Sequence, residues 1–341
     1  MAILTDLPVE ILQQILHLNQ SDDDDDDAAI LDEEDLLRVA LVAPRLVPIA
    51  QKQLFKNMYI FSYQYPGRAK FERFMTLLQS SPIIASYVER VHLKWITDRW
   101  EVSTILDDLL CLLPALRDLR FETDSPAHSK VLDFAFFDTN PMLNLKIVHL
   151  DGARMSFKSA LMLARKPGMV ELKLGRCEGY EADRECDTRE QANLALRTLD
   201  TTGSVLLDIE LEQLLACGPM VSTLICNLPR QLQDDDERPI LWQYRVGVPA
   251  SRQRLAHCLR PIAPSLIDLT VQTVSEDLRE EAAPDLTLLV SLKSLNIQAA
   301  CLWPGYVNVF YDERKHLSSR LPKSLEELEV INPYFLATEL I

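Results

Sequence analysis

Histidine and cysteine are the residue types best able to bind a metal or to act as nucleophiles, and this chain scatters them along its length. Its six histidines show no HExxH spacing, which zinc hydrolases use to place two ligands and a general base on one helix. Its seven cysteines include no CxxC pair, and the motifs GxSxG, GxxxxGK(S/T) and GxGxxG are all missing from the sequence. The sequence therefore predicts no catalytic residues, no metal site and no cofactor.

The surroundings of the cysteines and the first residues of the chain bear on the compartment. Most cysteines lie in apolar runs, such as LLCLLP at 109–114, which is typical of reduced, buried thiols. An odd number of cysteines at irregular spacing does not indicate a disulfide framework. The start, MAILTDLPVE, has neither the basic region nor the apolar block of a signal peptide. No apolar run approaches the roughly 20 residues needed to cross a bilayer. We therefore expect a cytoplasmic and/or nuclear protein that does not enter a membrane.

Negative charge is concentrated in one stretch. The net charge is −16, and Asp22–Asp35 holds ten acidic residues and no Lys or Arg, which leaves −6 for the rest of the chain. Six adjacent aspartates repel one another, so a disordered loop is expected there. The stretch lacks the alternating ligands and the glycine of a calcium-binding EF-hand loop. The chain has no Lys/Arg run of the kind that binds phosphate backbones, so we expect no nucleic-acid partner.

Apolar residues at helical spacing lie on both sides of the acidic stretch. Before it, residues 7–16 form one apolar helix stripe, with Pro8 in the first turn, where its missing N–H costs nothing. After it, DLLRVALVAPRLVPIAQKQLF at 35–55 is again apolar, and Pro44 and Pro48 predict that it forms short helices. Short helices rarely bury their apolar faces alone, so an exposed apolar surface is expected.

Beyond residue 55 the pattern apolar-x-x-apolar-x-apolar returns eight times, with LRTLDT at 196–201 as a weaker further copy. The eight copies are VERVHL (88–93), LRDLRF (116–121), LKIVHL (145–150), MVELKL (169–174), VSTLIC (221–226), LIDLTV (266–271), LKSLNI (292–297) and LEELEV (325–330). Their central positions, with that of the weaker copy, are Val91, Leu119, Val148, Leu172, Leu199, Leu224, Leu269, Leu295 and Leu328. Most separations are close to the leucine-rich-repeat period of about 20–29 residues. The interval of 45 residues between Leu224 and Leu269 predicts a loop insertion or an irregular repeat.

The intervals between copies hold helical segments, such as FKSALMLARK and LDIELEQLLACGP. A doubly wound domain would also alternate strands and helices, but its buried strands would be longer apolar runs. We therefore predict an α/β fold with two domains. A small helical domain over residues 1–55, with an acidic loop insertion at 20–35, precedes a curved leucine-rich-repeat-like solenoid over 56–341, in which short parallel strands alternate with helices.

The two parts together resemble a known family. LTDLPVEILQQIL followed by DLLRVALVAPRLVPIAQKQLFKNMYI resembles an F-box, and the continuation into FERFMTLLQSSPIIASYVERVHL resembles fungal F-box proteins that run into a degenerate leucine-rich-repeat domain. Members of that family are substrate receptors of SCF-type cullin–RING ubiquitin ligases, in which the F-box docks on a Skp-type adaptor. The chain departs from the family at Ala43 and Leu46, where a cysteine and a bulky aromatic are common, and in its acidic insertion.

The resemblance implies that large aliphatic side chains of the two helical segments bind the adaptor by burial. These residues are Leu7, Pro8, Ile11, Leu12 and Ile15 from the first segment, and Leu36, Leu37, Val39, Leu41 and Val42 from the second. The alternative is that the stripe packs only inside its own helical domain.

Strand residues beside each central apolar position point away from the core, because side chains alternate along a strand. The cationic members of this outward set in the first strands are the predicted substrate-binding residues: Arg90, His92, Lys94, Arg120, His149 and Lys173. A phosphorylated peptide paired with Arg90, Lys94 and Arg120 is one candidate ligand, and a merely solvated strand face is the alternative. Along the chain, the outward set is expected to change from basic to neutral and acidic.

The expected function is therefore a non-catalytic one. The chain would bind a Skp-type adaptor, and through it a cullin–RING ligase, while its repeats bind a protein target. The alternative is a leucine-rich-repeat scaffold that binds a partner without any ligase role.

Overall fold

The structure is a computed structural model, and it describes residues 47–62, 67–95, 108–123, 144–178, 192–230, 250–273, 283–302 and 317–331. The predicted helix at 7–16, the acidic loop and all ten predicted adaptor-binding residues lie outside these ranges. The boundary at residue 55 between the two predicted domains likewise stays a prediction.

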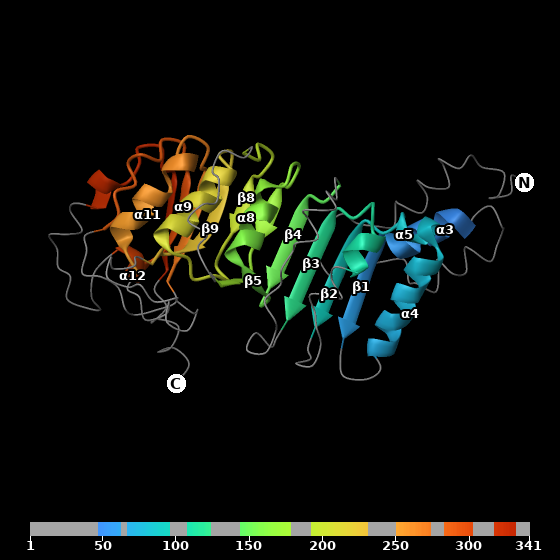
Figure 1. The fold of residues 1–341 in the computed structure, drawn as a ribbon. Coiled ribbons are helices and arrows are strands. Elements are labelled where there is room, and N and C mark those ends of the chain that lie inside the picture. The colour runs from blue at the N-terminus through green and yellow to red at the C-terminus, as the bar shows by residue number, and fades with distance from the viewer. Residues whose placement is uncertain are drawn as a thin grey trace, which may run out of the picture.

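Ten parallel strands form one sheet, and they follow one another in chain order (Figure 1). They are β1 (Asn57–Ser62), β2 (Arg90–Trp95), β3 (Asp118–Thr123), β4 (Ile147–Asp151), β6 (Glu171–Lys173), β8 (Thr198–Asp200), β9 (Thr223–Asn227), β10 (Asp268–Gln272), β11 (Ser294–Gln298) and β12 (Glu327–Ile331). The order never reverses, as it would in a doubly wound sheet. The predicted α/β architecture of stacked strand–helix repeats is confirmed for these residues.

The strands pair in the register that the repeated pattern predicts. Each central apolar residue lies opposite the central residue of the next strand, from Val91 and Leu119 to Leu295 and Leu328. The weaker copy at 196–201 forms β8 and keeps the same register. Strand β1 is a further repeat beyond the predicted copies, and its residues Phe55, Met58 and Ile60 follow the same apolar spacing.

The long interval between Leu224 and Leu269 adds no strand to the sheet between its two flanking strands. Strand β9 pairs directly with β10, so no other strand of the sheet lies between them. Arg230 and Ala250, on either side of residues 231–249, form an antiparallel bridge. The chain therefore leaves the repeat and returns to it at neighbouring positions.

The helices pack against the apolar face of the sheet (Figure 1). They are α3 (Val47–Lys56), α4 (Gly67–Ser80), α5 (Pro82–Ala85), α8 (Phe157–Arg165), α9 (Asp208–Cys217), α11 (Arg252–Cys258) and α12 (Ala299–Leu302). Ser156 caps α8 by accepting the Ser159 N–H, and Ser251 caps α11 by accepting the Arg254 N–H. Two short strands, β5 (Arg154–Ser156) and β7 (Arg176–Glu178), form a second parallel sheet.

In the ten-stranded sheet, one backbone hydrogen bond recurs at the start of every strand after β1. The backbone N–H of the residue just before the strand donates to the carbonyl of the equivalent residue one repeat earlier, at N···O distances of 2.7–2.9 Å. We call these residues the strand-start row: Lys56, Glu89, Arg117, Lys146, Val170, Arg197, Ser222, Ile267, Lys293 and Glu326. The bond joins each repeat to the one before it and fixes their relative register.

No helix in the described part of the chain is long and apolar enough to span a membrane.

Two leucines near one strand give a direct test of this packing. Leu172 is fully buried at the centre of β6, whereas Leu194, in the next repeat, is 64% exposed. Leu172→Ala should lower the free energy of unfolding by about 2–5 kcal/mol, because it leaves a cavity in the core. Leu194→Ala should change it by less than about 0.5 kcal/mol. Urea unfolding followed by circular dichroism measures both, and equal losses would contradict the assignment of inward and outward positions.

Candidate functional site

The face of the sheet opposite the helices carries the outward strand residues, and we call it the open face. All six predicted substrate-binding residues lie on it. Four of them follow one another in register across four strands: His92, Arg120, His149 and Lys173. Arg90 and Lys94 flank His92 on β2. The structure thus brings the predicted set together, and its role in binding stays a prediction.

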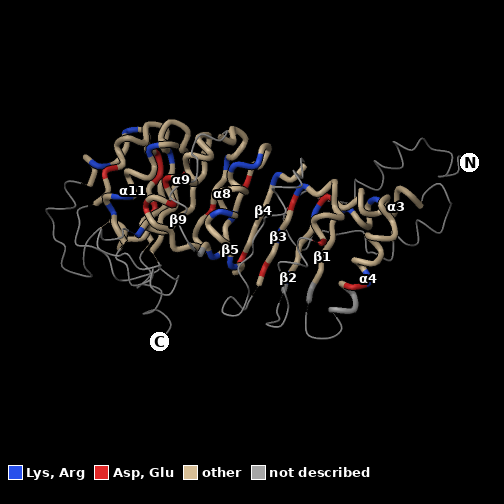
Figure 2. The backbone as a smooth tube through the Cα atoms, viewed as in Figure 1, with Lys and Arg blue, Asp and Glu red and all other residues tan. Residues whose placement is uncertain are grey.

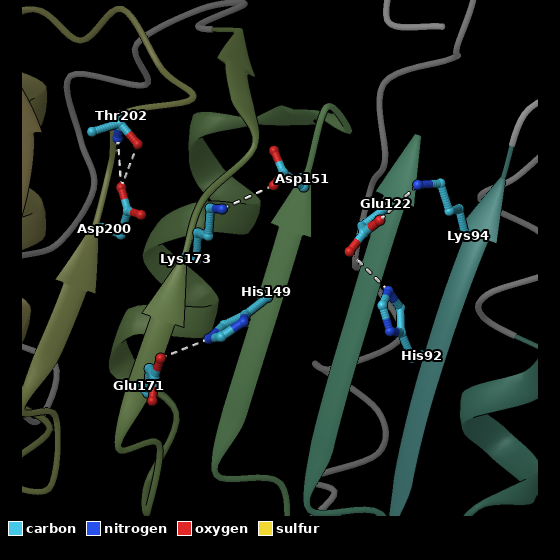
Figure 3. A network of polar contacts seen from close by, with 9 residues as sticks. All are labelled: His92, Lys94, Glu122, His149, Asp151, Glu171, Lys173, Asp200 and Thr202. Carbon is cyan, nitrogen blue, oxygen red and sulfur yellow. Dashed lines mark hydrogen bonds and ion pairs between the residues drawn. The ribbon is translucent and has the colours of Figure 1, made fainter. Parts of the chain in front are cut away.

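Most of these cations have a carboxylate from the open face beside them (Figure 3). His92 Nε2 lies 2.9 Å from Glu122 Oε1, and Lys94 Nζ lies 3.5 Å from the other oxygen of the same carboxylate. Two further pairs join neighbouring strands, at 2.7 Å between His149 and Glu171 and at 2.8 Å between Lys173 and Asp151. Arg120 Nε lies 3.5 Å from Asp118 Oδ1, two residues away on β3.

The expected basic character of the first strands is therefore wrong. Sequence alternation identifies the outward residues, but it does not show that a carboxylate of the same or the adjacent strand lies beside most of the cations. A phosphorylated ligand would have to displace Glu122 to reach Lys94, and Asp118 to reach Arg120. Most basic side chains of this face are therefore already paired with a carboxylate of the same face.

Lys173 shows the electrostatic consequence. Its hydrogen bond to Asp151 is the main cause that raises the pKa of the Lys173 ammonium group; burial opposes it, and the charges of Asp151, Asp200 and Glu122 add to the rise. The group is therefore fully charged at neutral pH. Asp200, next in register, instead accepts hydrogen bonds from the backbone N–H and the hydroxyl of Thr202.

An aromatic side chain extends this row at its first strand. Tyr59 of β1 is in register with His92, and the two rings pack with centroids 4.4 Å apart. Tyr59 is 57% exposed, more than any other large apolar residue described on the open face. It was not among the predicted residues, because the repeat that forms β1 was not predicted. An apolar triplet at Phe55, Met58 and Ile60 was the available signal.

The open face of the last strands has a different chemistry. Amide side chains there bond to a carboxylate and to the backbone: Asn296 donates to Glu329 at 2.7 Å, and Gln298 accepts the Thr273 N–H at 2.8 Å. Both glutamates of β12, Glu327 and Glu329, are exposed. The expected neutral to acidic character of this end is confirmed.

The cysteines do not form a reactive centre in the described residues. Cys177, Cys217, Cys226, Cys258 and Cys301 are buried thiols. Burial raises the pKa of Cys258 and Cys301 to about 12, and it raises the pKa of Cys226 well above its usual range. Cys111 differs from the expectation that the LLCLLP run buries its thiol, because it is exposed. It lies on the outer side of helical residues 108–112.

The polar groups of the described open face are arranged in pairs rather than in a larger cluster. Within the described ranges, no three His, Cys, Asp or Glu side chains are grouped so that they could hold a metal ion. The His92–Glu122 and His149–Glu171 pairs orient imidazole rings, but neither has a described nucleophile beside it.

Comparisons with known proteins do not identify a family for this chain. No protein-family profile matches the chain, and no curated protein sequence matches it. Among solved structures, the leucine-rich-repeat-containing protein LegL7 from Legionella pneumophila is similar at 13% identity and a TM-score of 0.35, covering 81% of this chain and 91% of that one. An internalin (InlF) from Listeria monocytogenes is similar at 16% identity and a TM-score of 0.35, covering 78% and 74%. A TM-score of 0.35 is too low to support a conclusion from these similarities. The repeat architecture is therefore assigned from the strand register described above.

The ion pairs of the open face should contribute little to stability, because they are partly exposed to solvent. In a double-mutant cycle of Lys173→Met and Asp151→Asn, we expect a coupling free energy below about 1 kcal/mol. Urea unfolding of the four proteins measures it. A coupling well above this value would show that the pair helps to hold the repeats together.

Thiol accessibility should follow burial. At pH 8, a thiol reagent such as DTNB should modify Cys111 rapidly and leave the buried thiols unmodified until the protein is denatured. Cys111→Ser should remove one equivalent from the fast phase, and Cys301→Ala should remove none. A fast phase that shrinks in Cys301→Ala would show that the core around α12 opens readily.

Proposed function

We propose that this chain is the substrate-recognition subunit of an SCF-type cullin–RING ubiquitin ligase. Its F-box-like N-terminal segment docks on a Skp-type adaptor, and its repeats bind the target protein. The observation that carries the proposal is the order of the sequence: a Leu-Pro-x-Glu helix, a leucine-rich helical segment, and then a repeat solenoid. The comparisons do not identify this role.

The junction between the two parts is consistent with such a receptor. Helix α3 forms the end of the predicted docking segment, with Pro48 in its first turn, as expected for a short helix. Ile49, Ala50 and Gln53 of α3 are buried, and the helix packs against β1 and α5. It ends at Lys56, where the strand-start row begins. A helix packed onto the first repeat would hold a docked adaptor in a fixed orientation relative to the solenoid.

Such a receptor needs no catalytic residue of its own. It acts by proximity, since it raises the effective concentration of a bound target near the enzyme that carries ubiquitin. An extended repeat surface suits this task, because it offers a long face for one partner while its end holds another. The six predicted substrate-binding residues and Tyr59 are candidates for target contacts on the open face.

A second candidate function is a leucine-rich-repeat scaffold that binds a partner without any ligase role. The described residues are equally compatible with it, since they contain the repeats and not the predicted adaptor-binding set. Adaptor binding is the property that separates the two functions.

The test is binding of the full chain to a purified Skp-type adaptor. Leu7→Asp combined with Ile11→Asp should weaken adaptor binding at least about a hundredfold, because each change places a charge in an apolar contact worth roughly 2 kcal/mol or more. Isothermal titration calorimetry measures the affinity. If the wild type does not bind the adaptor, or if the double variant binds as well as the wild type, the receptor function is wrong.

Two matched controls accompany this test. Ile83→Asp introduces the same charge at a residue that is 65% exposed on α5, and it should leave adaptor binding unchanged. Deletion of Asp22–Asp27 should also leave the affinity unchanged if the acidic stretch only improves solubility. A large effect of the deletion would assign the aspartates to the adaptor contact.

A further inference from the structure

Exposed apolar side chains gather along the edge of the sheet where the strands begin. Ten large apolar residues are exposed among those the structure describes, and five of the ten lie at this edge of β6 to β11. They are Val170 (37% exposed), Leu194 (64%), Met220 (43%), Ile267 (39%) and Val290 (68%). Single exposed apolar residues are normal, but a gathering of this kind marks an interaction surface more often.

Two rows of the repeats supply four of these residues, and the fifth, Met220, lies between the rows in its repeat. Val170, Arg197, Ser222, Ile267 and Lys293 follow one another in the strand-start row, and each is joined to the next by the recurring backbone hydrogen bond. Three residues earlier in each of these repeats lies a second row, which we call the turn row. Its members are all apolar: Pro167, Leu194, Pro219, Pro264 and Val290.

Side-chain contacts confirm that members of the turn row lie side by side. Ser265 donates to the carbonyl of Pro219 at 2.8 Å, and Ser291 donates to that of Pro264 at 2.7 Å. Arg197 lies between two apolar residues, because its guanidinium group donates to the carbonyls of Leu194 and Met220. The apolar side chains therefore form one strip across five consecutive repeats.

Strand pairing does not require the strand-start row to be apolar. The core position of each repeat lies between the two rows, at Met169, Leu196, Val221, Leu266 and Leu292, all fully buried. Earlier in the solenoid the strand-start row is charged, with Glu89, Arg117 and Lys146, whereas the turn row has Ser86 and Pro114. Those repeats pair in the same register, so the exposed apolar residues of the strand-start row, Val170 and Ile267, need an explanation other than strand pairing.

Positive charge flanks the strip. From β4 to β12 the strand-start row contains Lys146, Arg197 and Lys293, and its one carboxylate is Glu326. Lys293 and Glu326 form a 3.2 Å pair in which both side chains are more than half exposed, so the pair is weak. Figure 2 shows blue segments along this edge. A ligand with apolar and acidic side chains is complementary to it.

The spacing of the repeats matches a helix. Neighbouring strands lie about 4.8 Å apart, so the strip from Val170 to Val290 crosses four such steps and spans roughly 19 Å. An α-helix advances about 5.4 Å per turn, and three to four turns cover the same length with one apolar side chain per turn. An amphipathic helix laid along the edge can thus place successive apolar side chains between successive repeats.

We propose that the strand-start edge of β6 to β11 binds an acidic amphipathic helix of a partner protein. A second copy of this chain fits less well, because a two-fold pairing would set Lys146, Arg197 and Lys293 against the same cations of the other copy. This binding does not depend on the proposed adaptor contact. If the chain is a ligase receptor, the edge is a surface for its target that is separate from the open face.

The test uses a labelled helical peptide of about 18 residues, with leucine once per turn and glutamate, glutamine and alanine elsewhere. Fluorescence anisotropy with the full chain should show saturable binding. Leu194→Glu combined with Val290→Glu should weaken binding at least about tenfold, because both changes add negative charge to the apolar strip. Lys146→Glu should weaken it several-fold, and a peptide with lysine in place of glutamate should bind at least about tenfold more weakly.

The matched control is Ile83→Glu combined with Ile209→Glu, which changes two residues of similar exposure on α5 and α9. It should bind the peptide within about twofold of the wild type. No saturable binding by the wild type, equal binding of the lysine peptide, or an equal loss in the control would overturn the proposal. So would a change of sedimentation in Leu194→Glu plus Val290→Glu, which would assign the strip to self-association. Leu7→Asp plus Ile11→Asp should bind the peptide normally, so failure of the adaptor contact and failure of this surface are distinguishable.

Discussion

The backbone hydrogen bond from each strand-start residue to the equivalent residue one repeat earlier is the contact on which the surfaces of this protein depend. It recurs from Glu89 to Glu326 at nearly constant length, so it fixes the register of every pair of neighbouring strands. Side chains alternate with a period of two along a strand, and a slip of one residue would exchange the inner and outer sets. The positions of the buried central residues, the open face and the strand-start edge all depend on this strand register.

Much of the solenoid was predictable, because the buried row imposes a pattern on the sequence that does not depend on partners. The positions from Val91 to Leu328 pair as their spacing indicates. The same pattern is present before the first predicted copy, at Phe55, Met58 and Ile60, where the prediction did not include the repeat that forms β1. It left open whether the interval between Leu224 and Leu269 contains a further strand of the sheet, because spacing alone cannot show this. The direct pairing of β9 with β10 shows that no strand lies between these two in the sheet.

The chemistry of the surfaces was less predictable, because it depends on residues that are distant in sequence. Alternation placed Lys173 and His92 on the open face, yet their partners, Asp151 and Glu122, lie 22 and 30 residues away. Counting cations along the chain therefore overstated the positive charge of the first strands. The apolar character of the strand-start edge was not predicted, for another reason. Its apolar residues lie in turns, where neither the strand period nor the helix period indicates which side chains are exposed.

The two surfaces differ in what a partner must displace. On the open face, a charged ligand competes with carboxylates that already lie within 2.7–3.5 Å of the cations, so it gains little net electrostatic energy there. At the strand-start edge, Leu194 and Val290 are the two most exposed large side chains of the strip, and covering them removes apolar area from water without breaking an ion pair. A partner of modest size therefore gains more from the edge than from the face.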